Sequence, residues 1–268
     1  MHDALFHQAV GLQQLMSAVP PRPRLIPVSA SGDRCTELAL LWQLTTELNG
    51  LGAQVLVLDG TAFEDDGNHG LVDALEHGAT THFDTTPNGL QIWPAAMGLQ
   101  RLINLHHTLP GHQYPVLTQW LEKGVVLVYA PAERLAQLLK HGDVRPLVVS
   151  SIDPQRVIDA YQALKTLIQG ARLRPQVITV IPKRADAFFK HAVRINANLR
   201  RCAAENLDMM LETQTVVMDA VGDQSSHQEI RSIALRMLEN SSAVSAGELD
   251  WFQHPGQKPA RESSVWSH

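Results

Sequence analysis

The chain has 268 residues, of which 44% are hydrophobic and 18% charged, so it holds one large domain or two small ones and is not globally disordered. Its formal net charge of −5 argues against a nucleic-acid-binding protein that relies on a strongly basic surface. Two cysteines, Cys35 and Cys202, are too few for a disulfide-stapled fold or a cysteine-rich zinc site.

The N-terminal residues lack the pattern of a secretory signal, and no apolar run approaches the roughly 20 residues that span a bilayer. We therefore expect a cytoplasmic protein. Apolar side chains follow helical spacing in residues 3–18, and a proline-rich stretch then interrupts the pattern. The expected parts are a tethered helix in 1–19, a stiff linker in 20–23, a main domain in 24–240 and a disordered tail in 241–268.

The main domain opens with a strand, a loop, a helix and a second strand. The strands are predicted at 24–28 and 54–58, and the helix at 36–51. One side of this helix is expected to be buried, namely Leu38, Leu41, Trp42, Thr45 and Leu48. Such a βαβ unit with continuously apolar strands is typical of a parallel sheet that is covered on both faces.

Similar patterns recur along the rest of the domain. Further strands are predicted at 90–93, 125–129, 146–150 and 176–181, and further helices at 154–169, 187–206 and 228–239. The expected fold class is a doubly wound, mostly parallel α/β sheet with helices on both faces. The last helix has opposite charges on its polar face that nearly cancel, so we expect it to pack on the core and not on a membrane.

A loop of small and polar residues follows the first strand. In a parallel sheet, ligands bind where a strand ends and a helix begins. A phosphate loop needs several glycines, a lysine and a Ser or Thr for magnesium. Here Gly32 is the one glycine, Cys35 stands at the lysine position and Thr36 at the hydroxyl position. An anion held weakly by Arg34 and the loop amides, and a plain turn with no ligand, remain equal alternatives.

Other reactive side chains form no recognised site. The closest histidine cluster is His106, His107 and His112, which lacks the spacing of a helical metal-binding motif, so we expect no metal. The acidic run 64–66 is interpreted as a solvated loop. Neither Ser29 nor Ser31 lies in a nucleophile-elbow motif, which argues against a hydrolase triad.

Four segments resemble a known family in the same order along the chain. Residues 55–59 (VLVLD) resemble its second strand, 89–98 (GLQIWPAAMG) its GL-x-V-L-P-x-x-x-G stretch, and 148–161 (VVSSIDPQRVIDAY) its T-x-P-E-P-T-S-x-x-D-A-Y segment. Residues 7–16 (HQAVGLQQLM) are similar to its D-Q-A-x-x-L-R-x-L helix. The family is the MinD/ParA group of P-loop ATPases, which has the SIMIBI-class fold. The helix that residues 7–16 resemble is the one found in a subgroup of this family, the FlhG (FleN, YlxH) flagellar-number regulators.

For the nucleotide, the resemblance implies a degenerate site. Family members bind ATP and magnesium and hydrolyse ATP, and the matching positions here are Ser31, Gly32, Arg34, Thr36 and Asp59. Both signature lysines and the second acidic residue after the second strand are missing. We therefore expect a non-hydrolysing pseudo-ATPase with no assured cofactor, and ATP with magnesium only if the loop still binds it.

For partners, the resemblance implies an FlhF-type signal-recognition-particle GTPase. Gln8 matches the glutamine that orders the attacking water on that GTPase. The matching contact residues are Leu5, Ala9, Leu12 and Leu15. Flagellar basal-body or transcriptional partners, and a peripheral place at the inner membrane or cell pole, are further implications; nucleic acid is not expected as a partner. A helix packed on its own domain is the alternative for this segment.

Two other functions stay open at this point. One is an active MinD/ParA-type ATPase for cell-pole or envelope-machinery positioning, in which Arg34 replaces the lysine. The other is a scaffold of another pathway, such as cellulose-machinery placement, that kept the fold and lost the chemistry.

Overall fold

The computed structural model describes residues 24–65, 70–77, 91–108, 124–140, 144–182, 186–218 and 227–240. In chain order the elements are β1 (Arg24–Ala30), α2 (Arg34–Gly50), β2 (Gln54–Asp59), α3 (Leu71–His77), β3 (Gln91–Pro94), α4 (Ala96–Thr108), β4 (Gly124–Pro131), α6 (Ala132–Leu138), β5 (Leu147–Ser150), α7 (Pro154–Lys165), η1 (Thr166–Gly170), β6 (Gln176–Pro182), α8 (Asp186–Leu207), β7 (Glu212–Met218) and α9 (His227–Asn240). The predicted N-terminal helix, linker and tail lie outside these ranges.

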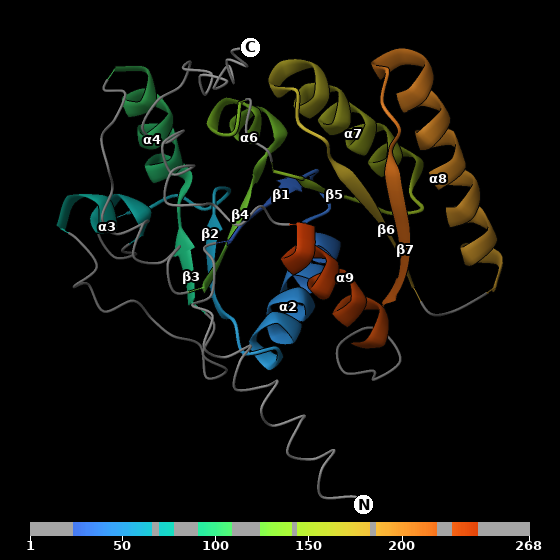
Figure 1. Ribbon diagram of the computed structural model, residues 1–268, viewed down its shortest axis with the longest axis horizontal. Coiled ribbons are helices and arrows are strands. Elements are labelled where there is room, and N and C mark those ends of the chain that lie inside the picture. The colour runs from blue at the N-terminus through green and yellow to red at the C-terminus, as the bar shows by residue number, and fades with distance from the viewer. Residues whose placement is uncertain are drawn as a thin grey trace, which may run out of the picture.

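The strands of the described ranges form one parallel sheet in the order β3-β2-β4-β1-β5-β6-β7. The predicted doubly wound α/β class is confirmed. The helices that follow the neighbouring strands β1 and β4, namely α2 and α6, cover opposite faces of the sheet (Figure 1). The carboxyl ends of β1 and β4 therefore mark a topological switch point, where sheets of this kind place their ligands.

Each central strand supplies two cores with alternate side chains. In β4, Val126 and Val128 face one core, and Val125 and Leu127 face the other. The first core is closed by α3, α4, α6, α7 and α8, and the second by α2 and α9 (Figure 1). Burial on both faces explains why the strands are continuously apolar and do not alternate with polar residues.

The buried face of α2 differs from the predicted one. Leu38 and Trp42, predicted to be buried, are 39% and 43% exposed. The helix instead buries Leu40 and Leu44 together with Leu41, Thr45 and Leu48. Apolar residues surround most of this helix, so the sequence defines no narrow stripe, and packing against the sheet and α9 selects the face.

The last described helix, α9, packs as predicted. Its apolar residues Ile230, Ile233, Ala234 and Met237 are buried in the second core. This apolar face is therefore used inside the domain and is not presented to a membrane surface. Among the described helices, none is both long and apolar enough to cross a bilayer.

Candidate functional site

The loop between β1 and α2 lies at the topological switch point of the sheet. Gly32 has a φ of +94°, a left-handed conformation in which glycine is favoured. The loop after β5 is adjacent because β5 pairs with β1, and it brings in Arg156 of α7. A Cβ atom on Gly32 would lie 3.0 Å from Nη1 of Arg156, so this arginine rests directly against the loop.

The carboxylate of Glu37 occupies the inside of this loop. Its Oε1 accepts hydrogen bonds from the backbone N–H of Ser31 at 2.7 Å and from the Ser31 hydroxyl at 2.5 Å. The side chain of Glu37 is fully buried. A backbone amide that points into such a loop is the group that a phosphate loop offers to its anion. Here that amide of Ser31 is already bound to a carboxylate of the same chain.

A buried tyrosine completes the arrangement from the neighbouring strand. The hydroxyl of Tyr129, on β4, donates a hydrogen bond to Oε2 of Glu37. Burial and the hydrogen bond to Glu37 raise the pKa of Tyr129 well above its usual value. The phenol therefore stays protonated and remains a donor to Glu37. We call Ser31, Glu37 and Tyr129 the carboxylate plug.

The arginines around the plug are turned towards other groups. Nη2 of Arg34 lies 3.7 Å from Oδ2 of Asp59, and the Arg34 side chain is 61% exposed. Arg134 donates to the carbonyl oxygen of Gly60 at 2.6 Å, and Arg156 pairs with Asp159 at 3.1 Å. Each of these guanidinium groups already has an acceptor, and the charges of Arg34 and Arg156 are offset by the carboxylates of Asp59 and Asp159.

The acidic residue at the end of β2 is held by its own turn. Oδ1 of Asp59 accepts from the Thr61 backbone N–H at 2.9 Å and from the Thr61 hydroxyl at 2.6 Å. Asp33 acts as the N-cap of α2 and accepts from the Thr36 backbone N–H at 3.3 Å. The start of α2, where a helix dipole attracts anions, is thus occupied by the carboxylates of Asp33 and Glu37.

Glu64, which we predicted to lie in a solvated loop, has a structural role. Its two carboxylate oxygens accept from the backbone N–H groups of Met97 and Gly98, each at 2.8 Å. These amides belong to the first turn of α4, so Glu64 caps that helix. Glu64 does lie in a loop, as predicted, and Asp65 beside it is exposed, but Glu64 is half-buried by a contact between two segments that are far apart in sequence.

Of the predicted nucleotide residues, the structure brings Ser31, Gly32, Arg34 and Asp59 together, and Thr36 lies in the first turn of α2. The predicted partner residues Leu5, Gln8, Ala9, Leu12 and Leu15 lie outside the described residues. Within the described ranges, no group of three or more His, Cys, Asp or Glu side chains is placed to hold a metal ion.

Three residues of this site were not predicted from the sequence, namely Glu37, Tyr129 and Arg156. Glu37 directly follows Thr36, so an acidic residue in the first turn of the predicted helix was the available signal. Tyr129 and Arg156 carried no comparable signal. They reach the loop only because β4 and β5 both pair with β1.

No protein-family model matches the chain, and no curated protein sequence does. Solved structures do match it in fold. The MinD cell division protein of Aquifex aeolicus is 16% identical over 81% of this chain and 97% of that one, with a TM-score of 0.53. Cobyrinic acid a,c-diamide synthase of Mycobacterium smegmatis, solved with an ATP analog and magnesium, is 13% identical over 82% and 95%, with a TM-score of 0.55. The chain thus has the fold of MinD-type P-loop proteins.

Proposed function

We propose that this chain is a regulatory protein that has kept a MinD/ParA-type P-loop fold and does not hydrolyse ATP. The observation that carries the proposal is the carboxylate plug. A nucleotide triphosphate would meet the negative charge of Glu37 at the amide of Ser31, which is already hydrogen-bonded. Like charges brought together in a partly buried site repel strongly.

The absence of the signature lysines also disfavours ATP binding and hydrolysis. Phosphoryl transfer depends on positioned cations and an ordered water, and the loss of a single electrostatic stabiliser costs on the order of 10²–10³ in rate. The lysine position holds Cys35, an exposed side chain that supplies no positive charge. The nearest positive charge, on Arg34, is directed to Asp59. Tight binding and hydrolysis of ATP are both disfavoured.

Calorimetry of the full chain with magnesium-ATP tests this proposal. We expect no binding heat at nucleotide concentrations up to about 1 mM, a limit that corresponds to roughly −4 kcal/mol of binding free energy. Micromolar binding by the natural chain would contradict the proposal.

Glu37→Gln is the matched variant, because it removes the negative charge and keeps the size of the side chain. If Glu37→Gln gives binding heat and the natural chain does not, the carboxylate plug is what prevents nucleotide binding. If neither protein gives binding heat, the missing lysines contribute as well. Either result keeps the natural chain a protein that does not bind ATP.

At a finer level, we propose that the chain is an FlhG-like regulator of flagellar number and placement in the cytoplasm. Residues 3–18 would contact an FlhF-type GTPase, with Gln8 ordering water in its active site. The proposal is supported by the glutamine, alanine and leucine spacing of residues 7–16 and by a domain with the MinD-type fold behind it. The amphipathic helix and proline-rich linker expected from the sequence would suit insertion into a groove.

A peptide of residues 3–18 and the purified GTPase test the finer proposal. The peptide is expected to raise GTP turnover at least tenfold, in the range that one water-ordering group contributes. The Gln8→Ala peptide is expected to bind with similar affinity and to stimulate little. Unchanged turnover with the natural peptide, or full stimulation by Gln8→Ala, would contradict this role.

One observation favours the alternative of an active ATPase in cell-pole or envelope-machinery positioning. Arg34 is 61% exposed at the start of α2, and its ion pair with Asp59 is long at 3.7 Å. A surface pair of this kind contributes about 0–1 kcal/mol, so a phosphate could draw the guanidinium away. The calorimetry above decides between the two functions.

A further inference from the structure

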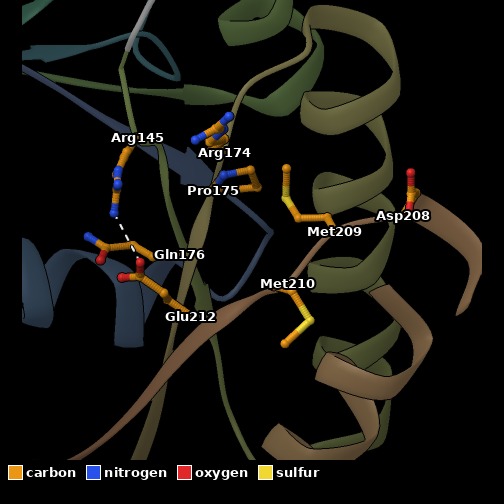
Figure 2. A pocket seen from close by; sticks show the side chains of 8 residues that line it. All are labelled: Arg145, Arg174, Pro175, Gln176, Asp208, Met209, Met210 and Glu212. Carbon is orange, nitrogen blue, oxygen red and sulfur yellow. Dashed lines mark hydrogen bonds and ion pairs between the residues drawn. The ribbon is translucent and has the colours of Figure 1, made fainter. Parts of the chain in front are cut away.

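A cavity of about 310 Å³ lies at the amino ends of β5, β6 and β7, on the edge of the sheet opposite to the carboxylate plug. Three loops contribute to it, because each of these strands is preceded by a loop at this edge. Figure 2 shows Arg145, Gln176 and Glu212 on one side of the cavity, and Met209 and Met210 on the other. None of these residues belongs to the loop between β1 and α2, where a nucleotide would bind.

Unusual backbone conformations build two of these loops. Arg172 and Asp208 have φ values of +58° and +49°, and they are the two non-glycine residues with positive φ in the described part of the chain. Each ends a helix in the way that glycine usually does, with Arg172 N–H bonded to the carbonyl of Ile168 at 3.0 Å. Disfavoured conformations of this kind gather at functional sites. Asp208 lines the cavity, and Arg172 lies two residues before Arg174, which also lines it.

Two arginines, Arg145 and Arg174, line the cavity together with two acidic residues, Asp208 and Glu212. Within the described residues, Arg174 is exposed and makes no hydrogen bond or ion pair. Arg145 pairs with Glu212 at 3.0 Å, and their side chains are 37% and 64% exposed. An exposed pair contributes at most about 1 kcal/mol, so an incoming carboxylate can compete with Glu212 for Arg145. Guanidinium groups bind carboxylates in a bidentate manner.

Apolar surface lies next to these arginines. Met210 is 91% exposed, the most exposed of the large hydrophobic side chains in the described ranges. Met209 packs partly against the first core, and Pro175 is buried at the cavity wall. Methionine side chains adapt to irregular partners, and exposed apolar surface beside polar groups marks interaction sites.

The hollow surface also extends beyond the main cavity. A second, smaller hollow of about 40 Å³ shares Gln176 and Glu212 with the first and continues to Arg236 of α9. Together the two hollows run from Arg145, past Gln176 and Glu212, to Arg236. The main volume lies at the lower end of the range of small-molecule pockets, about 300–1,000 Å³. An extended peptide fits this shape better than a compact ligand.

We propose that this groove binds a short extended segment of a protein partner, in which a large hydrophobic side chain is flanked by carboxylates. The carboxylates pair with Arg174 and Arg145, and the hydrophobic side chain packs on Met209 and Met210. Because the groove and the plug lie at opposite edges of the sheet, a partner bound here leaves the carboxyl edge accessible.

Selection of peptides on the full chain tests this inference. A random-peptide phage library is panned on the immobilised protein, and enriched peptides are synthesised with a fluorophore for anisotropy measurements. The enriched sequences are expected to carry Asp or Glu next to Leu, Phe or Met. Arg174→Glu is expected to weaken their binding at least tenfold, and Met210→Asp about as much.

The charge-matched control is Arg194→Glu, an exposed residue of α8 that lies 13 residues before the end of this helix. It is expected to leave the affinity within about twofold, since roughly 20 Å of helix separates it from the cavity, about twice the screening length. Failure to enrich any peptide, enrichment without acidic residues, or equal binding to Arg174→Glu would overturn the inference. Binding of single-stranded DNA or anionic vesicles that Arg174→Glu abolishes, without peptide binding, would overturn it as well.

Discussion

Replacing Glu37 by Ala is expected to lower the free energy of unfolding by about 3 kcal/mol. The fully buried carboxylate accepts three hydrogen bonds, two from Ser31 and one from Tyr129. Its removal leaves the buried phenol of Tyr129 without its acceptor and opens a space in the second core. Loss of a partner for a buried donor costs about 1–3 kcal/mol, and the space adds to this.

Urea unfolding of the natural protein, Glu37→Ala, Tyr129→Phe and the double variant measures the effect and its origin. The double-mutant cycle is expected to give a coupling of about 1–2 kcal/mol between Glu37 and Tyr129, because they share a buried hydrogen bond. Glu37→Gln keeps an acceptor oxygen and is expected to lose less than Glu37→Ala. A loss below about 0.5 kcal/mol in Glu37→Ala would show that the plug contributes nothing to stability.

A second large loss is expected for Gly124→Ala, about 2–4 kcal/mol of unfolding free energy. Gly124 opens β4 and pairs with Gln54 of β2. A Cβ atom at Gly124 would lie 2.1 Å from the backbone oxygen of Gln54 and 2.9 Å from its carbonyl carbon. Main-chain atoms cannot rotate away as a flexible side chain does, so the two strands would have to separate at this point.

Gly50→Ala is the matched control for the second prediction. Gly50 is the last residue of α2, and a Cβ atom there meets nothing within 4 Å. Alanine has the higher helix propensity, so this variant is expected to be neutral or to gain up to about 1 kcal/mol. Thermal or urea unfolding compares the two variants. Equal stability of Gly124→Ala and Gly50→Ala would contradict the steric argument.

The bonds of Glu37 also explain how the loop after β1 holds its conformation. In this chain an internal carboxylate satisfies the loop amide of Ser31, and it does so while bonded to the neighbouring strand through Tyr129. The loop therefore needs no bound anion to hold its conformation. Under the function proposed above, the fold would serve as a support for partner binding.

The sequence by itself determined the sheet and its class. Continuous apolar runs, such as residues 54–58 and 125–129, predicted strands that are buried on both faces, and these became β2 and β4. The absence of a lysine between Arg34 and Thr36 was equally visible. β7 was missed because it is an edge strand whose residues 212–215 are polar, with Glu212 exposed and 213–215 half-buried, so its apolar signal is weak.

Only the tertiary structure decided what fills and surrounds the sites. Glu37 became a plug because β4, which pairs with β1, places Tyr129 opposite it, and Arg156 reached Gly32 because β5 pairs with β1 on the other side. The peptide groove likewise joins loops that precede three different strands. Parallel pairing brings together the ends of strands that are distant in sequence. Local patterns of side chains predict where strands form, but they do not predict the order of the strands in the sheet, which decides which ends meet.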